Sequence, residues 1–148
     1  MSNIKVQTPI IHIPSFKEYK ISGLELMGKI EGLGLEIPLG MLDWTYYFTD
    51  LEGWGKVLYD LVFSSNLYKE DRFDCENYSI KAFNECAERY GLNTLGVVIG
   101  DTSAGRHGFN MFYHGDGFML WEPNEGFPFS GGAFEIGEYD YLPEVILI

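Results

Sequence analysis

Apolar residues recur at helical spacing in two segments of the chain. Behind Thr49-Asp50-Leu51-Glu52, which has the form of a capping box, the apolar positions predict a helix that extends to about Phe63. A second helix is predicted from about Cys75 to Tyr90, because Gly91 stands in the stop position. Its inward stripe would consist of Cys75, Tyr78, Ser79, Ala82, Cys86 and Tyr90.

The pattern changes from helical to strand-like spacing beyond Gly91. Residues 95–99 are rich in strand-forming side chains, and residues 107–113 and 118–122 predict two strands around a turn at 114–117. Residues 145–148 could form a last strand. Helices in the N-terminal half followed by antiparallel strands predict an α+β fold.

The length of 148 residues predicts a single domain that spans residues 1–148. Prolines and glycines are frequent in residues 1–48, which are therefore expected to be irregular apart from a short helix near Leu24–Glu31. The helix and sheet core is expected in residues 49–148.

Composition narrows the classes of partner. The formal net charge is −12, so neither nucleic acid nor an anionic membrane is an expected partner. No apolar run approaches the ~20 residues that a membrane span needs, and no signal peptide is evident, so the sequence predicts a soluble, cytoplasmic protein. Residues 67–148 carry 14 acidic and 5 basic residues, a field that favours a neutral or basic ligand.

The candidate chemistry lies in Cys75, His107 and Glu122. Cys75 is placed at a predicted helix N-terminus, where the helix dipole favours a thiolate. Cys86 lies eleven residues further, about 16 Å along a helix axis, so a disulfide between the two cysteines is excluded.

His107 and Glu122 are predicted to share one face of a β-hairpin. If the loop has its centre at His114-Gly115, the two residues lie directly opposite one another; if the centre is Gly115-Asp116, they are diagonal neighbours. In either register a carboxylate can orient the imidazole. Asp101 is the runner-up for this third position.

Three short motifs carry a resemblance to a known family. They are Asp-Cys-Glu-Asn-Tyr at 74–78, Arg-His-Gly-Phe-Asn-Met-Phe at 106–112 and Leu-Trp-Glu-Pro-Asn at 120–124. In this order they resemble the transglutaminase-like branch of the papain-like cysteine peptidase superfamily, in its short bacterial and phage type. The peptidase domain attached to some fungal lectins, which is calcium-dependent, is similar in using glutamate in the third place.

The resemblance implies a papain-like or transglutaminase-like fold, in which the helix at Cys75 packs on an antiparallel sheet. It also implies a Cys–His–Glu triad that transfers an acyl group through a thioester. Cys75 would be the nucleophile, His107 the base and Glu122 the orienting acid in a cysteine peptidase, an amidase or a transglutaminase, with a peptide or protein as substrate. No cofactor is required on this reading. The acidic cluster of Glu70, Asp71, Asp74 and Glu76 could collect calcium, but EF-hand spacing is absent, and a solvated acidic surface is the favoured interpretation.

An alternative is a catalytically inactive binding or accessory module on the same fold, phage-related or bacterial. Such a module would bind a peptide or glycan through an aromatic surface around Tyr113, Phe118, Trp121 and Phe127. The sequence leaves the oligomeric state open.

Overall fold

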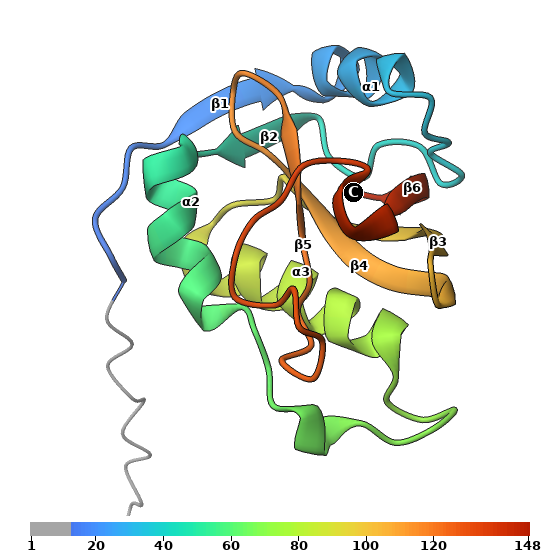
Figure 1. Cartoon of the computed structure of the whole chain (residues 1–148). Coiled ribbons are helices and arrows are strands. Elements are labelled where there is room, and N and C mark those ends of the chain that lie inside the picture. The colour runs from blue at the N-terminus through green and yellow to red at the C-terminus, as the bar shows by residue number, and fades with distance from the viewer. Residues whose placement is uncertain (1–12) are drawn as a thin grey trace, which may run out of the picture.

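The structure is a computed structural model that describes residues 13–148. It confirms an α+β fold, in which three α-helices accompany two antiparallel sheets within the described residues (Figure 1). The helices are α1 (Gly23–Gly32), α2 (Leu51–Val57) and α3 (Cys75–Tyr90). Short 3-10 turns lie at Leu58–Asp60 and Ser65–Leu67, between α2 and α3, and at Glu138–Asp140.

The larger sheet has four antiparallel strands in the order β5-β4-β3-β6. Its strands are β3 (Leu95–Thr102), β4 (Gly105–Tyr113), β5 (Phe118–Trp121) and β6 (Leu142–Leu147). The predicted turn is also present, since the His114 amide donates to the Gly117 carbonyl at 3.0 Å. The β3–β4 and β4–β5 connections each join strands that are adjacent both in the sheet and along the chain.

The smaller sheet corrects the expected division into N-terminal helices and later strands. Strands β1 (Tyr19–Ser22) and β2 (Thr45–Phe48) pair antiparallel around α1, inside the region that was expected to be irregular. Residues 1–12 of that region lie outside the described residues. The short helix predicted there is confirmed as α1, whereas a single domain over residues 1–148 stays a prediction.

Helix α2 begins one residue later than the capping-box pattern suggested. The Asp50 side chain, rather than that of Thr49, accepts a hydrogen bond from the Gly53 amide at 2.9 Å. Thr49 is instead buried against Gly53, where an added Cβ would lie 1.9 Å from the threonine hydroxyl oxygen. The α-helix ends at Val57, and a 3-10 turn replaces its predicted last turns.

Helix α3 has the predicted bounds. Gly91 caps it in the left-handed conformation with φ of +68°, which a glycine adopts without strain. Buried Asn110 on β4 fixes the helix to the sheet, because its Nδ2 donates to the carbonyls of Ser79 and Gly96, both at 3.0 Å.

Hydrophobic side chains cover both faces of the larger sheet. Helix α1 and the smaller sheet lie over one face, where Leu26 and Ile30 pack with Phe109 and Met111. Helices α2 and α3 lie over the other face, and their core includes Trp54, Val57, Leu61, Ala82, Cys86, Leu95, Phe112 and Trp121. Among the helices described, none has the length and apolar character needed to cross a membrane.

Candidate functional site

The three predicted site residues lie at the ends of three elements. Cys75 is the first residue of α3, His107 lies near the start of β4, and Glu122 directly follows β5. At the helix start, the Asp74 amide donates to Oδ1 of Asn77 at 3.2 Å, so the side chain of Asn77 satisfies a backbone group that no helical carbonyl can reach.

Gly108 allows the start of α3 to touch the backbone of β4. A Cβ at this position would lie 3.0 Å from the Cα and N of Glu76 and 3.2 Å from the carbonyl carbon of Cys75. Any larger side chain would therefore push the helix start away from the strand. This close approach brings Cys75 beside His107.

Strands β4 and β5 place His107 and Glu122 diagonally. Their register pairs Tyr113 with Phe118 and Asn110 with Trp121, which corresponds to the predicted loop centred on Gly115-Asp116. Nε2 of His107 lies 2.6 Å from Oε2 of Glu122. The expectation that these two side chains meet is thus confirmed.

Glu122 is fully buried, and each of its oxygens is hydrogen bonded. Oε2 accepts from the Tyr141 hydroxyl at 2.8 Å in addition to contacting His107, and Oε1 accepts from the Asn124 amide at 3.0 Å. A buried carboxylate with this number of partners is held in one orientation.

Burial and hydrogen bonding act in opposite directions on His107. Burial lowers the pKa of the imidazole, but hydrogen bonds and charge interactions with the side chains of Cys75 and Glu122 outweigh it and raise the pKa to about 9. His107 is therefore an imidazolium at neutral pH, positioned between a thiol and a carboxylate. Burial, together with the Glu122 charge, also raises the pKa of Tyr141, which keeps that hydroxyl protonated as a donor.

Aromatic rings enclose the imidazole. Phe127 lies 4.7 Å from the His107 ring between centroids, Tyr141 meets it edge-on at 5.7 Å, and Phe109 is stacked at 6.0 Å. These rings exclude water from the ion pair, which strengthens it.

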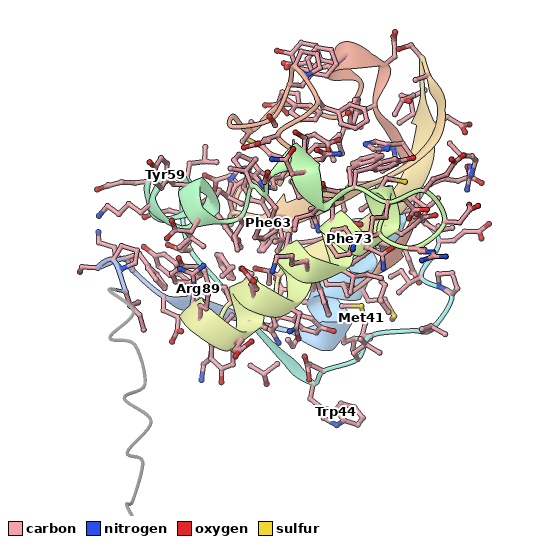
Figure 2. All side chains as sticks on the ribbon, turned by 90° about the horizontal axis from the view of Figure 1, so that it is seen from below. Met41, Trp44, Tyr59, Phe63, Phe73 and Arg89 are labelled. Carbon is pink, nitrogen blue, oxygen red and sulfur yellow. The ribbon has the colours of Figure 1, made fainter. Side chains whose placement is uncertain are left out.

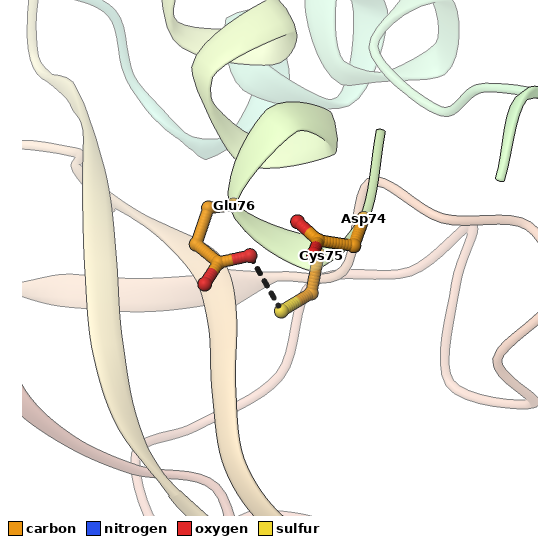
Figure 3. Close-up of side chains that lie close together, drawn as sticks. All are labelled: Asp74, Cys75 and Glu76. Atoms are coloured by element: carbon orange, nitrogen blue, oxygen red, sulfur yellow. Dashed lines mark hydrogen bonds between the residues drawn. The ribbon is translucent and has the colours of Figure 1, made fainter. Parts of the chain in front are cut away.

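Cys75 is the partly exposed member of the site. Its thiol donates a hydrogen bond to Oε2 of Glu76 at 3.3 Å, as Figure 3 shows. The adjacent carboxyls of Asp74 and Glu76 share a hydrogen bond, which raises the pKa of Asp74 and lowers that of Glu76. Two acids therefore stand directly beside the thiol.

Three potential metal ligands lie together at the start of α3, within the acidic cluster considered for calcium. One oxygen or sulfur atom from each of Asp74, Cys75 and Glu76 lies within 4.8 Å of the others. Calcium takes six to eight oxygen ligands, and here one of the three groups is a thiol. Within the described residues, Glu70 and Asp71 do not join this group. Calcium binding stays a prediction.

The second cysteine is excluded from the site. Cys86 is fully buried in the core between α2, α3 and the sheet, and burial raises the pKa of its thiol. Asp101, the runner-up for the third position, is exposed and pairs with Arg106 at 3.4 Å.

Sequence reasoning missed Tyr141, and it misplaced the aromatic binding surface. Tyr141 follows the Glu138–Asp140 turn, and no spacing in the sequence relates it to Glu122. Tyr113 and Trp121 were expected on an aromatic surface, but they are buried in the two cores, and Phe127 packs on His107. The proposed surface around these residues is therefore wrong.

Comparisons with known proteins give matches among solved structures alone. No family model matches the chain, and no curated protein does. The PSL1a-E64 complex matches with a TM-score of 0.66 and 16% identity, over 87% of this chain and 51% of that one. Polyporus squamosus lectin, bound to the human-type influenza-binding epitope Neu5Aca2-6Galb1-4GlcNAc, matches with a TM-score of 0.53 and 15% identity, over 70% and 42%.

These matches correct the family assignment. The structures that the chain resembles are those of a lectin and not of transglutaminase-like or papain-like peptidases, so the expected membership in that superfamily and the peptidase, amidase or transglutaminase activity taken from it are wrong. The chain spans about half the length of the structures it matches, and it shares the fold of that part.

Proposed function

We propose that this chain is a binding module whose ligand is a glycan. The observation that carries the proposal is the fold shared with Polyporus squamosus lectin, whose structure holds a sialylated epitope. Because the match includes 42% of the lectin chain, the epitope of that protein is not transferred to this one.

The charge of the chain bears on which glycan it would bind. A net charge of −12 creates a negative field that repels sialic acid and other anionic sugars. A neutral glycan meets no such repulsion. We therefore propose neutral glycans as the ligand class, in place of a peptide or protein.

Direct titration tests this proposal. The full chain is titrated with lactose, N-acetyllactosamine and the sialylated trisaccharide, and binding is followed by calorimetry and by changes in NMR spectra. We expect a neutral glycan to bind with a Kd of about 1 mM or tighter. The heat-unfolded chain serves as the control. Absence of saturable binding by every glycan tested would overturn the proposal.

A second candidate function rests on a different observation. The 2.6 Å contact between His107 and the fully buried Glu122 holds an imidazolium next to Cys75. An imidazolium stabilises a thiolate, and the thiolate is the nucleophilic form of cysteine. We propose that Cys75 is a reactive nucleophile that forms a covalent bond with an electrophilic ligand, while His107 supplies the charge and Glu122 orients the ring.

Alkylation by iodoacetamide tests the reactive thiol. The Cys75 sulfur displaces iodide and forms a carbon–sulfur bond. At neutral pH we expect Cys86→Ala to be alkylated as fast as the natural chain and Cys75→Ala to remain unlabelled. We expect His107→Gln to react at least about tenfold more slowly, a change that corresponds to about 1.4 kcal/mol. Equal rates for His107→Gln and the natural chain would contradict this candidate and leave glycan binding untouched.

A further inference from the structure

A concave site lies on the side of the molecule formed by α1 and the loop before β2. It is a cavity of about 340 Å³, a volume within the range of small-molecule sites. Its lining combines apolar side chains with one carboxylate and one indole: Leu24, Met27, Met41, Leu42, Asp43 and Trp44. The cavity shares no lining residue with the Cys75 site.

Trp44 is the unusual member of this lining. It is 94% exposed, whereas Trp54 is 1% and Trp121 is 3% exposed. Figure 2 shows its side chain projecting away from the body of the molecule. Within the described residues, no aromatic ring or cation stacks on it. Exposed large aromatic groups beside a cavity are typical of binding sites.

The backbone around Trp44 is held in place before any ligand arrives. The Gly23 amide donates to the Trp44 carbonyl at 2.8 Å, and the Asp43 amide donates to the Tyr46 hydroxyl at 3.0 Å. Gly23 is required for this contact, because a Cβ there would lie 2.6 Å from the Asp43 carbonyl oxygen. A preorganised site loses little entropy on binding.

The Asp43 side chain is also held by a hydrogen bond, but its carboxylate can accept further hydrogen bonds. Its Oδ2 accepts from Nδ2 of Asn93 at 2.9 Å, and an ionised carboxylate has about four acceptor positions. The lining therefore offers a flat apolar ring next to a fixed hydrogen-bond acceptor. It includes one acidic and no basic side chain.

We propose that this cavity binds one neutral pyranose unit of a glycan. The apolar C–H face of the sugar ring lies on the Trp44 indole, and its hydroxyl groups donate to the Asp43 carboxylate. The single negative charge excludes a sialic acid or uronic acid from this position. The inference rests on the proposed glycan-binding function and assigns that function to a site.

Tryptophan fluorescence isolates the proposed contact. Since Trp54 and Trp121 are buried, acrylamide quenching in the folded chain reports on Trp44. The probes are the methyl glycosides of glucose, galactose, mannose and N-acetylglucosamine. We expect at least one of them to protect Trp44 from acrylamide in a saturable manner, and sialic acid to give no protection.

Variants decide whether the sugar lies in this cavity. Trp44→Ala should weaken the binding of that glycoside at least about tenfold, and Trp44→Phe should retain part of the affinity. Tyr59→Ala is the matched control, because Tyr59 is an aromatic residue with 81% exposure that lines a different cavity. We expect this variant to bind like the natural chain.

Three results would overturn the inference. Binding unaffected by Trp44→Ala would place the sugar elsewhere, and glycan binding itself would stand. No binding of any glycan, mono- or oligosaccharide, would overturn the proposed function together with this site. Sedimentation showing a dimer that Trp44→Ala converts to a monomer would identify a second copy of the chain as the occupant.

Discussion

The carboxylate of Glu122 lies 2.6 Å from the imidazole of His107 and has no exposed surface. The contact joins β4 to the segment that directly follows β5. The Tyr141 hydroxyl and the Asn124 amide donate the other hydrogen bonds that the carboxylate accepts. A buried pair of opposite charges with satisfied hydrogen bonds makes the stability of the fold depend on pH.

The stability of the chain should fall as the pH rises from about 6.5 to about 9. The folded pKa of His107 is raised from 6.5 to about 9, so the folded state binds the proton more tightly than the unfolded state. The stabilisation is complete below pH 6.5 and is lost as the pH passes through 9. At about 1.4 kcal/mol per pKa unit, the loss is on the order of 3 kcal/mol.

Urea denaturation at several pH values measures this loss. His107→Gln removes the titrating group, so its free energy of unfolding should vary less over the same pH range. A natural chain whose stability follows that of the variant across this range would refute the prediction.

Tyr141→Phe should destabilise the chain by about 1.5–3 kcal/mol, because it removes a hydrogen bond to a buried carboxylate. Tyr139→Phe is the matched control, since Tyr139 is half-exposed and stacks on Phe129 through its ring. We expect the control to change the free energy of unfolding by less than about 0.5 kcal/mol. Equal effects of the two substitutions would show that the Tyr141 hydroxyl contributes nothing.

The two thiols should differ in access to reagents. Cys75 is partly exposed, whereas Cys86 has no exposed surface and a pKa raised by burial. Titration with an aromatic disulfide that releases a coloured thiolate on reaction should therefore detect one thiol in the folded chain and two after unfolding in urea. Detection of two thiols at the same rate before unfolding would contradict the packing of Cys86.

Gly108→Ala should destabilise the chain by roughly 1–3 kcal/mol, because the added methyl group meets the backbone at the start of α3. It should also slow the alkylation of Cys75, since the helix start moves away from His107. Gly28→Ala is the control within α1, where a Cβ meets nothing within 4 Å. That substitution should stabilise the chain by about 0.5–1 kcal/mol. Thermal or urea denaturation would measure both changes in the free energy of unfolding.

Local signals predicted α3 and the β4–β5 hairpin well. Gly91 marks the end of α3, and a turn of even length leaves the hairpin with two alternative registers. The diagonal placement of His107 and Glu122 could therefore be expected from the sequence, since strand geometry relates residues that are fifteen positions apart.

Contacts between distant segments could not be predicted. The pairing of β1 with β2 spans α1 and the loop that follows it, and Tyr141 reaches Glu122 from a turn that has no periodic pattern. The burial of Tyr113 and Trp121 was missed because aromatic residues suit a binding surface and a core equally well. Three short motifs likewise describe local geometry, which unrelated chains can share, and they led to the wrong family.

The enclosure of the His107–Glu122 pair has a consequence for spectroscopy. A proton on Nε2 of His107 faces a buried oxygen at 2.6 Å, and the surrounding rings of Phe109, Phe127 and Tyr141 separate it from bulk water. Such a proton exchanges slowly with solvent and resonates far downfield of the backbone amides in a one-dimensional NMR spectrum. The resonance of this proton therefore reports on the His107–Glu122 pair in the natural chain, without any label.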